Sequence, residues 1–344
     1  MRLGSLFSGY GGLDLGVSSV YDTTTAWVCD VEPGPRRILA HHWPDVPNLG
    51  DVTAVDWRAV EPVDIIAGGS PCQDLSHAGR RRGMRAGTRS GLWASMCDAV
   101  EIIRPSLVVW ENVRGALSAP ADSDVESCPL CLGDDADVSL RALGRVLGDL
   151  AELGYDAEWC SVRASDVGAP HRRDRIFVTA HPADADCPRL DGRWTPERHT
   201  ESGAAAPVTA LLPTPTVTDL GARMSLDEWD EWVAKQRHLH MNGNGHGNAL
   251  SVATRRDLGR YQEAMSAWEV ILGRPAPAPT EDGLVSPRFA EWMMGLPDGW
   301  VTSVPGVSRQ QQLRALGNGV VSRQAAEALR RLDMMRRTVE EPAA

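Results

Sequence analysis

The stretch Gly68-Gly69-Ser70-Pro71-Cys72-Gln73 follows directly on the apolar run Val63-Asp64-Ile65-Ile66-Ala67. The run suits a short buried strand, and the two glycines end it, so that Cys72 stands near the carboxyl end of that strand. Open α/β sheets carry out their chemistry at this edge. The pattern therefore predicts an α/β fold in which Cys72 is a nucleophile. The competing interpretation is a small buried hydrophobic residue, the usual role of a free cysteine.

Length and composition are those of a globular enzyme. The chain has 344 residues, of which 42% are hydrophobic and 24% are charged, and this suggests one large domain or two. No stretch approaches the roughly 18 apolar residues of a membrane span. The first residues are also too short in their apolar part for a secretory signal, so we expect a cytoplasmic protein.

The seven cysteines are odd in number and irregularly spaced, which favours reduced thiols over a disulfide framework. Cys128 and Cys131 have the spacing of half a zinc site. Because the matching half is missing from the sequence, we expect no metal.

Charge is negative overall but unevenly distributed. The formal net charge of −11 argues against a general nucleic-acid binder, because phosphate contacts need local cations. Arginines nevertheless cluster at 80–89, just after Cys72, and again at 172–175. An acidic body with such basic segments could guide an anion to one face.

Three features of residues 1–51 predict a nucleoside pocket. Leu3–Phe7 is typical of a strand, and the glycine turn Ser8-Gly9-Tyr10-Gly11-Gly12 that follows it would bring a ligand close to backbone N–H groups. A second strand, Ala26–Glu32, ends on a carboxylate that could accept hydrogen bonds from ribose hydroxyls, and Asp51 could accept from an adenine amino group. The glycine spacing fits neither NAD nor ATP. A tight turn with surface carboxylates is the alternative.

Two further strands bring polar side chains toward Cys72. The apolar run Pro105–Trp110 ends in Glu111, whose carboxyl group could act as an acid near neutral pH if burial raised its pKa. Arg173 and Arg175 lead into another apolar strand, and alternation places both on one face. There they could hold an anion or a pyrimidine carbonyl group. Structural ion pairs are the alternative for all three residues.

The rest of the chain differs in character. An amphipathic helix over 140–153 ends at Gly154. Residues 184–287 lack the alternation of strand and helix, and only the capping box Ser225–Glu228 predicts a helix there. The pattern of regular secondary structure returns at 288. Further along the chain, we expect Gly317-Asn318-Gly319 to form a turn before a helix and to complete the nucleoside pocket.

In this order the motifs resemble those of the C5-cytosine DNA methyltransferases. They are Phe7-Ser8-Gly9-Tyr10-Gly11-Gly12-Leu13, Gly69-Ser70-Pro71-Cys72-Gln73, Glu111-Asn112-Val113, Arg173-Asp174-Arg175 and Gly317-Asn318-Gly319-Val320. They span residues 1 to about 182 and 288 to 335. Any one motif is weak evidence, but five in sequence are specific. Two positions depart from the pattern: His171 stands where glutamine is common, and Gly319 where serine is common.

The resemblance implies a Rossmann-like S-adenosylmethionine-dependent methyltransferase domain at 1–182 and a smaller, variable target-recognition domain at 183–287. Residues 288–344 would return to the catalytic domain. S-adenosyl-L-methionine would be the methyl donor and S-adenosyl-L-homocysteine the product. The residues implied for donor binding are Phe7, Gly9, Tyr10, Gly11, Gly12, Glu32, Asp51, Val52, Pro71, Asn318 and Val320.

The resemblance also implies the reaction. Cys72 would attack C6 of a cytosine flipped out of double-stranded DNA, Glu111 would protonate or hydrogen-bond N3, and Arg175 with Arg173 would hold the base. The protein would be a site-specific, monomeric enzyme of a bacterium or of a virus in a bacterial host. A cognate restriction endonuclease would be a functional rather than a physical partner. The alternatives are a tRNA cytosine-5 methyltransferase of the same superfamily and a catalytically silent DNA-binding relative.

Overall fold

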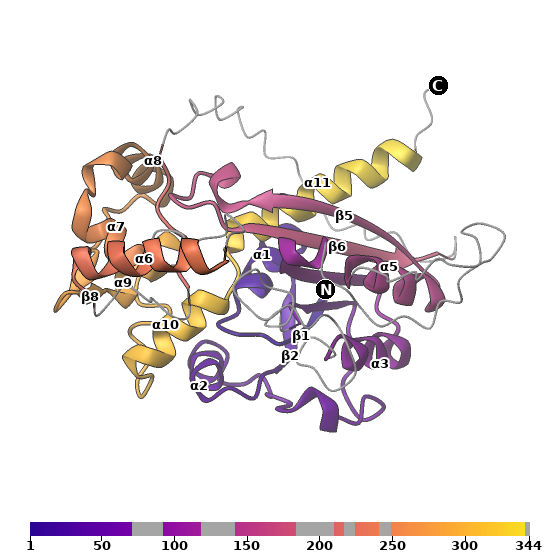
Figure 1. Cartoon of the computed structure of the whole chain (residues 1–344). Coiled ribbons are helices and arrows are strands. Elements are labelled where there is room, and N and C mark those ends of the chain that lie inside the picture. Colours follow the sequence, from indigo (N-terminus) through magenta and orange to yellow (C-terminus); the bar gives the residue numbers. More distant parts are fainter. Residues whose placement is uncertain (71–91, 118–141, 184–209, 217–223, 241–248, 341–344) are drawn as a thin grey trace.

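The computed structural model describes residues 1–70, 92–117, 142–183, 210–216, 224–240 and 249–340 (Figure 1). Pro71, Cys72, Cys128, Cys131 and the arginines at 80–89 lie outside the described residues. Their roles therefore remain predictions.

The centre of the molecule is a six-stranded sheet with the order β2-β1-β3-β4-β6-β5. The strands are β1 (Arg2–Leu6), β2 (Thr24–Cys29), β3 (Ile65–Gly68), β4 (Leu107–Val113), β5 (Tyr155–Arg163) and β6 (Asp174–Pro182). The first four strands pair in parallel, and β6 pairs antiparallel with both β4 and β5. This arrangement confirms the predicted α/β fold and places the ends of β1, β3 and β4 at one edge.

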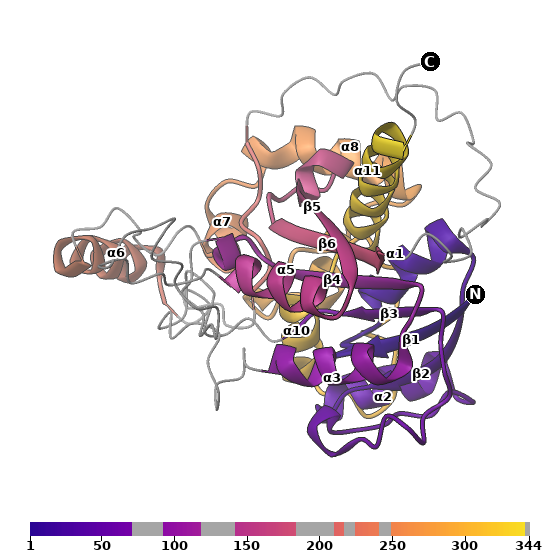
Figure 2. The same ribbon diagram turned by 90° about the vertical axis from the view of Figure 1, so that its right-hand side faces the viewer.

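The central strands are apolar on both faces because helices cover both faces. In β4, Leu107 and Val109 join a buried cluster with residues of α1 (Gly12–Tyr21) and α11 (Ser322–Glu340). Val108 and Trp110 join another with α3 (Trp93–Ile103) and α5 (Ala142–Glu152). Figure 2 shows α3 and α5 on the near side of the sheet. The helix predicted over 140–153 is α5, and Gly154 ends it with a φ of 78°.

A second packed region contains α2 (Pro33–His42), α7 (Leu250–Arg256), α8 (Gln262–Leu272), α9 (Pro287–Met293) and α10 (Arg309–Asn318), with a small hairpin of β7 (Thr280–Glu281) and β8 (Leu284–Val285). The helix α6 (Leu226–His240) stands apart from this region in Figure 2 and contacts it through α7. The core of this region contains Trp268, Phe289 and Trp292 together with Tyr10 of the first glycine turn. The N-terminal glycine turn is therefore packed against the C-terminal half of the chain.

The capping box that predicted α6 is formed: the Ser225 N–H donates to Glu228 Oε2 at 2.7 Å, and the Glu228 N–H donates to Ser225 Oγ at 3.2 Å. The expectation of a single helix in 184–287 was wrong, since α7 and α8 also lie there. The turn expected at 317–319 begins later than predicted, because α10 continues through Asn318. A capping box at Ser308 starts α10, and burial of Leu316 outweighs the low helix propensity of Gly317.

Candidate active site

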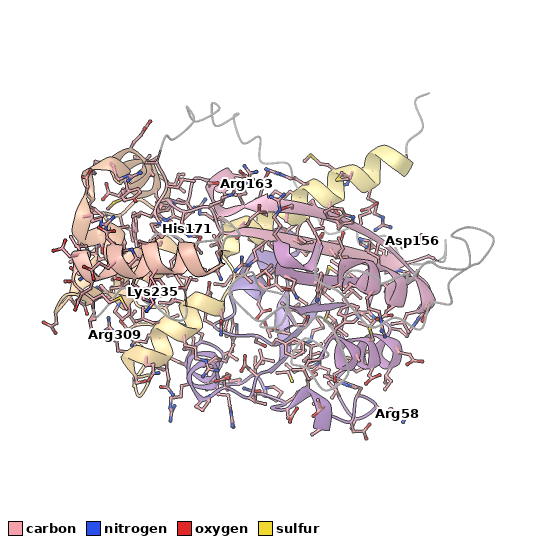
Figure 3. All side chains as sticks on the ribbon, in the orientation of Figure 1. Arg58, Asp156, Arg163, His171, Lys235 and Arg309 are labelled. Atoms are coloured by element: carbon pink, nitrogen blue, oxygen red, sulfur yellow. The ribbon has the colours of Figure 1, made fainter. Side chains whose placement is uncertain are left out.

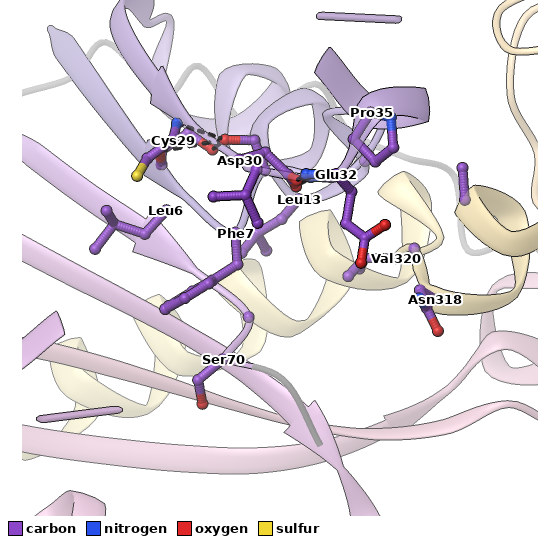
Figure 4. Close-up of a pocket in the computed structure, with 18 of the residues that line it drawn as sticks. Leu6, Phe7, Leu13, Cys29, Asp30, Glu32, Pro35, Ser70, Asn318 and Val320 are labelled. Atoms are coloured by element: carbon purple, nitrogen blue, oxygen red, sulfur yellow. Dashed lines mark hydrogen bonds between the residues drawn. The ribbon is translucent and has the colours of Figure 1, made fainter. Parts of the chain in front are cut away.

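A cavity of about 560 Å³ opens at the carboxyl edge of the sheet. Its walls come from the segments that follow β1, β2 and β3, from β4 and β6, and from the junction between α10 and α11. Figure 4 shows the Glu32 side chain pointing toward Asn318 and Val320, which come from the other end of the chain. Of the predicted residues, those that line the cavity are Phe7, Gly9, Gly12, Glu32, Asp51, Val52, Glu111, Arg175, Asn318 and Val320.

The glycine turn after β1 brings backbone to the cavity wall. Gly9 has a φ of 58° and Gly11 a φ of 82°, both in the left-handed region that glycine adopts without strain. A Cβ atom on Gly12 would lie 2.3 Å from the carbonyl oxygen of Val320, so only glycine fits there. The turn is held by Asp30, whose Oδ2 accepts from the Gly9 N–H at 2.9 Å.

Tyr10 and Gly11 do not line the cavity. The Tyr10 ring is fully buried, and its hydroxyl donates to the carbonyl oxygen of Val320 at 2.6 Å. This contact explains the departure at Gly319, because a Cβ atom there would lie 1.9 Å from Tyr10 Cε1. Tyr10 therefore supports the cavity wall from behind and occupies the space that a side chain at 319 would need.

Two carboxylates stand at the mouth of the cavity. Glu32 Oε1 pairs with Arg314 of α10 at 2.7 Å, a contact that the sequence did not predict. Asp51 Oδ1 accepts from the backbone N–H of Thr53 at 3.0 Å and from its hydroxyl at 2.8 Å, and these bonds lower the pKa of Asp51. Asp30 was also missed, although it directly follows β2. It accepts from the N–H of Glu32 as well as that of Gly9, and so fixes both sides of the cavity.

Glu111 and Arg175 form an ion pair on the cavity wall. The Glu111 side chain is nearly buried, and its Oε1 lies 2.9 Å from Arg175 Nε. Burial raises the pKa of Glu111, while the positive charges of Arg175 and Arg173 oppose that rise. A Cβ atom on Gly69 would lie 2.9 Å from Glu111 Oε2, so the glycine lets the backbone after β3 pass beside the carboxyl group.

The end of β3 is tied to β4 by two hydrogen bonds. Trp110 Nε1 donates to Ser70 Oγ at 3.0 Å, and Asn112 Nδ2 donates to the carbonyl oxygen of Ser70 at 3.1 Å. Both donors are buried. The chain therefore leaves the sheet toward residue 71 at a fixed point beside Glu111.

Arg173 does not stand beside Arg175 on the cavity wall. Its φ of 25° places it before the regular strand β6, so the alternation that predicted one shared face with Arg175 does not apply. Its guanidinium donates to the carbonyl oxygens of Pro215 at 3.3 Å and Gly317 at 3.0 Å, and also to that of Gly319. Arg173 does not line the cavity, but it holds the segment that carries Asn318 in place.

His171 lies at the junction between the sheet and the helical region, as Figure 3 shows. Its Nε2 lies 3.1 Å from the carbonyl oxygen of Met293, and burial lowers the pKa of His171 to about 3. The neutral ring therefore makes a structural contact with α9 at the position where the resemblance leads one to expect glutamine.

Within the part of the chain that the structure describes, no group of three or more His, Cys, Asp or Glu side chains is arranged to hold a metal ion. A helix both long enough and apolar enough to cross a membrane is likewise not found among the described helices.

An open α/β sheet with a glycine-lined cavity and a buried carboxyl–guanidinium pair at its edge defines a Rossmann-like enzyme that binds a nucleoside ligand. The chain belongs to the C-5 cytosine-specific DNA methylase family, whose model matches residues 1–332.

The type II methyltransferase M2.BsuMI of Bacillus subtilis is 32% identical over 184 residues, which are 52% of this chain and 42% of the relative. M1.ScrFI of Lactococcus lactis subsp. cremoris is 24% identical over 319 residues, 92% of this chain and 73% of the relative. The match thus spans less than half the length of the first relative. The solved structure of S. pombe Dnmt2 methyltransferase has a TM-score of 0.57 at 15% identity, with 98% of this chain and 99% of that chain covered, which shows the fold.

Family membership implies S-adenosyl-L-methionine as the methyl donor. The cavity fits this molecule in three respects. Its volume is within the usual range for small-molecule sites. The glycine turn brings backbone to the wall, and Glu32 and Asp51 bring carboxylate oxygens to it that can accept hydrogen bonds from hydroxyl and amino groups. The residues present therefore suit the donor and its product, S-adenosyl-L-homocysteine.

Proposed function

We propose that the protein is a site-specific DNA (cytosine-5-)-methyltransferase that acts on a cytosine flipped out of double-stranded DNA. The observation that carries this proposal is the Glu111–Arg175 pair, which lies 2.9 Å apart at the cavity wall. The pair stands beside the backbone of Gly69, three residues before the proposed nucleophile Cys72.

Covalent geometry supports a common site for Cys72 and Glu111. Because consecutive Cα atoms lie about 3.8 Å apart, a residue two positions after Ser70 has its Cα within about 7.6 Å of the Cα of Ser70. Ser70 itself is fixed against β4 by Trp110 and Asn112. A thiol at position 72 can thus reach the same substrate as the Glu111 carboxyl group.

The chemistry needs both groups. Cytosine C5 is a poor nucleophile, so we assign to the Cys72 thiolate the attack on C6, while Glu111 donates a proton to N3. Arg175 holds Glu111 and faces the base. S-adenosyl-L-methionine supplies the electrophilic methyl group to C5. Once C5 carries the methyl group, water accepts the C5 proton, the Cys72 thiolate leaves C6, and N3 returns its proton to Glu111, so that the aromatic ring is restored.

The donor site is proposed to include the cavity-lining residues that were predicted for donor binding, together with Pro71: Phe7, Gly9, Gly12, Glu32, Asp51, Val52, Asn318 and Val320. Tyr10 and Arg173 act as positioning residues, because their contacts hold Val320 and the 317–319 segment and do not line the cavity. Gly11 contributes the left-handed backbone of the glycine turn. Glu32 is also paired with Arg314, so the ribose would share this carboxylate with a guanidinium.

Residues 183–287 are proposed as the target-recognition domain, which reads bases in the major groove. The negative net charge requires that DNA phosphates meet local clusters of arginine. The relatives are type II methyltransferases of bacteria, and on that ground we place the enzyme in a restriction-modification system. A monomer in a bacterial cytoplasm remains our prediction.

The test is methyl transfer from labelled S-adenosyl-L-methionine to duplex DNA of mixed sequence, followed by nucleoside analysis. We expect 5-methylcytosine with the native protein and none with Cys72→Ala. Cys160→Ser is the matched control, since this thiol does not line the cavity, donates to the carbonyl oxygen of Ala328, and has a pKa that burial raises to about 11. The control should retain activity.

Full activity of Cys72→Ala would overturn the proposal. Transfer RNA tested in parallel decides between the two nucleic acids. DNA containing 5-fluorocytosine should trap the native enzyme covalently, whereas a silent DNA-binding relative would form no adduct.

A further inference from the structure

A buried carboxyl group on the cavity wall has no role in the reaction described above. Asp14, in the first turn of α1, is 2% exposed and lines the cavity together with Ser5, Ser8 and Gly12. Its Oδ1 atom has no hydrogen-bond partner among the described residues. An unpaired buried polar atom costs free energy, and at a ligand cavity it points to a partner that the ligand supplies.

The other oxygen of Asp14 belongs to a chain of hydroxyl groups. Oδ2 lies 2.9 Å from Ser5 Oγ, which lies 2.8 Å from Ser8 Oγ, and Ser8 donates to the carbonyl oxygen of Ser5 at 3.2 Å. The Ser5 hydroxyl has a single proton, which it can donate either to Asp14 Oδ2 or to Ser8 Oγ. A neutral Asp14 can donate to Ser5 while Ser5 donates to Ser8, and an ionised Asp14 can accept from Ser5. The network therefore tolerates both protonation states.

The surroundings of Asp14 bring its pKa close to neutral pH. Burial raises the pKa of Asp14 to about 7, and the hydrogen bond from Ser5 opposes the rise. No charged side chain among the described residues contributes to that shift. Apolar or small residues of α11 and β3 pack against α1, and the charged Asp333, Arg336 and Arg337 of α11 act on Tyr21 at the opposite end of α1 from Asp14. The titratable or charged groups elsewhere on the cavity wall are Cys29, Asp30, Glu32, Asp51, Glu111, Arg175 and Arg314.

The donor and the product differ in charge. S-adenosyl-L-methionine carries a sulfonium cation that S-adenosyl-L-homocysteine lacks, while the ammonium, carboxylate and adenosine groups are the same in both. We propose that Asp14 is a charge-selective residue of the donor site, whose ionised carboxylate favours the sulfonium donor over the neutral thioether and so promotes replacement of product by donor. The inference rests on the proposed function.

The proposal predicts how affinity depends on pH. A cation binds the ionised form of Asp14 better than the neutral form, so donor affinity should rise with pH through about 7, where Asp14 loses its proton. Product affinity should change less, because the product lacks the sulfonium. The ratio of the two Kd values isolates this charge from the groups that the ligands share. We expect it to increase on the order of tenfold, the effect of one partly screened charge pair in a protein cavity.

The experiment is calorimetric titration of the native protein with each ligand between about pH 5.5 and 8.5. Near pH 7, donor binding should release about half a proton, measured from the dependence of the binding heat on the buffer, whereas product binding should release less. Asp14→Asn should remove both the proton release and the pH dependence of the ratio. Asp51→Asn is the control: it should weaken both ligands alike and keep the pH dependence.

A ratio in the native protein that stays constant with pH would overturn the inference, as would an Asp14→Asn protein that keeps the native pH dependence. If Asp14→Asn does not fold, the titration of the native protein decides alone. Failure of both ligands to bind at any pH would overturn the proposed function and this inference with it. Binding of both with a constant ratio would overturn only the inference.

Discussion

At the scale of single residues, the site depends on a carboxyl group under two opposing influences. Burial favours the neutral form of Glu111, and the adjacent Arg175 favours the ionised form. A group balanced in this way can carry a proton to a substrate at neutral pH and give it up there. The glycine at position 69 is part of the same arrangement, because any side chain there would meet Glu111 Oε2.

Replacing Glu111 tests this role. Glu111→Gln keeps the shape of the side chain but removes the acid, so we expect methyl transfer to fall about 100- to 10,000-fold, the usual contribution of a general acid. Affinity for S-adenosyl-L-methionine should stay within a few-fold of the native value. The measurement is the single-turnover rate of methyl transfer, together with donor binding by calorimetry.

Glu327→Gln serves as the matched control, because that carboxylate forms an ion pair with Arg331 on α11, away from the cavity. It should react at the native rate. A Glu111→Gln enzyme with the native rate would contradict the assigned role.

At the scale of secondary-structure elements, the cavity depends on the close approach of two turns. The turn between β1 and α1 meets the turn between α10 and α11, with Gly12 against the Val320 carbonyl group and Gly319 against the Tyr10 ring. Each turn depends on the glycines of its own segment, but this part of the cavity wall forms only where the two turns pack against each other. Arg173 reinforces this contact from the side of β6.

Alanine at Gly12 should separate the two turns. The added Cβ would lie 2.3 Å from the Val320 oxygen, so we expect a loss of about 1–3 kcal/mol in the free energy of unfolding, as for other overpacked sites, and weaker donor binding. Urea denaturation and calorimetry measure the two effects.

Gly148→Ala in α5 is the matched comparison, because no atom within 4 Å would meet its Cβ. A glycine inside a helix costs stability, so this variant should gain about 0.5–1 kcal/mol and bind the donor normally. Equal behaviour of the two variants would show that the close approach at Gly12 has no effect.

At the scale of the whole molecule, the two ends of the chain share one core. α11 packs against α1 and β5, and Leu329 and Leu332 lie with Leu3 and Val17 in a single buried cluster. A second link joins Trp300 to the first turn, since its Nε1 donates to the Tyr10 carbonyl oxygen at 2.9 Å. The donor cavity and the C-terminal helix should therefore unfold together.

Leu329→Ala tests this coupling. The residue is fully buried, so its truncation should cost about 2–5 kcal/mol. Unfolding followed by tryptophan fluorescence and loss of donor binding should shift together to lower urea concentration. Met334→Ala, on the same helix but 55% exposed, should change stability by less than about 0.5 kcal/mol. Donor binding that survives after the fluorescence transition of Leu329→Ala would refute the shared core.

Local patterns predicted much of this molecule. Apolar runs marked β1, β2, β3, β4 and β6, and the capping box at Ser225 marked α6, because burial and capping are properties of a few neighbouring residues. The helices α7, α8 and α10 were missed. Their stability depends on the core around Trp268 and Trp292, which lies between segments distant in the sequence.

The same division holds for the site. The family, the order of the motifs and ten residues of the cavity wall could be predicted from the residues alone, because each motif is a short stretch whose chemistry is visible in its side chains. Three features emerge only in the folded chain: Arg173 binds the 317–319 segment instead of standing beside Arg175, Arg314 pairs with Glu32, and Asp14 lies buried at the cavity. These outcomes depend on which side chains meet across the fold and on how much water is excluded between them, and neither is encoded in the spacing of residues along a single segment.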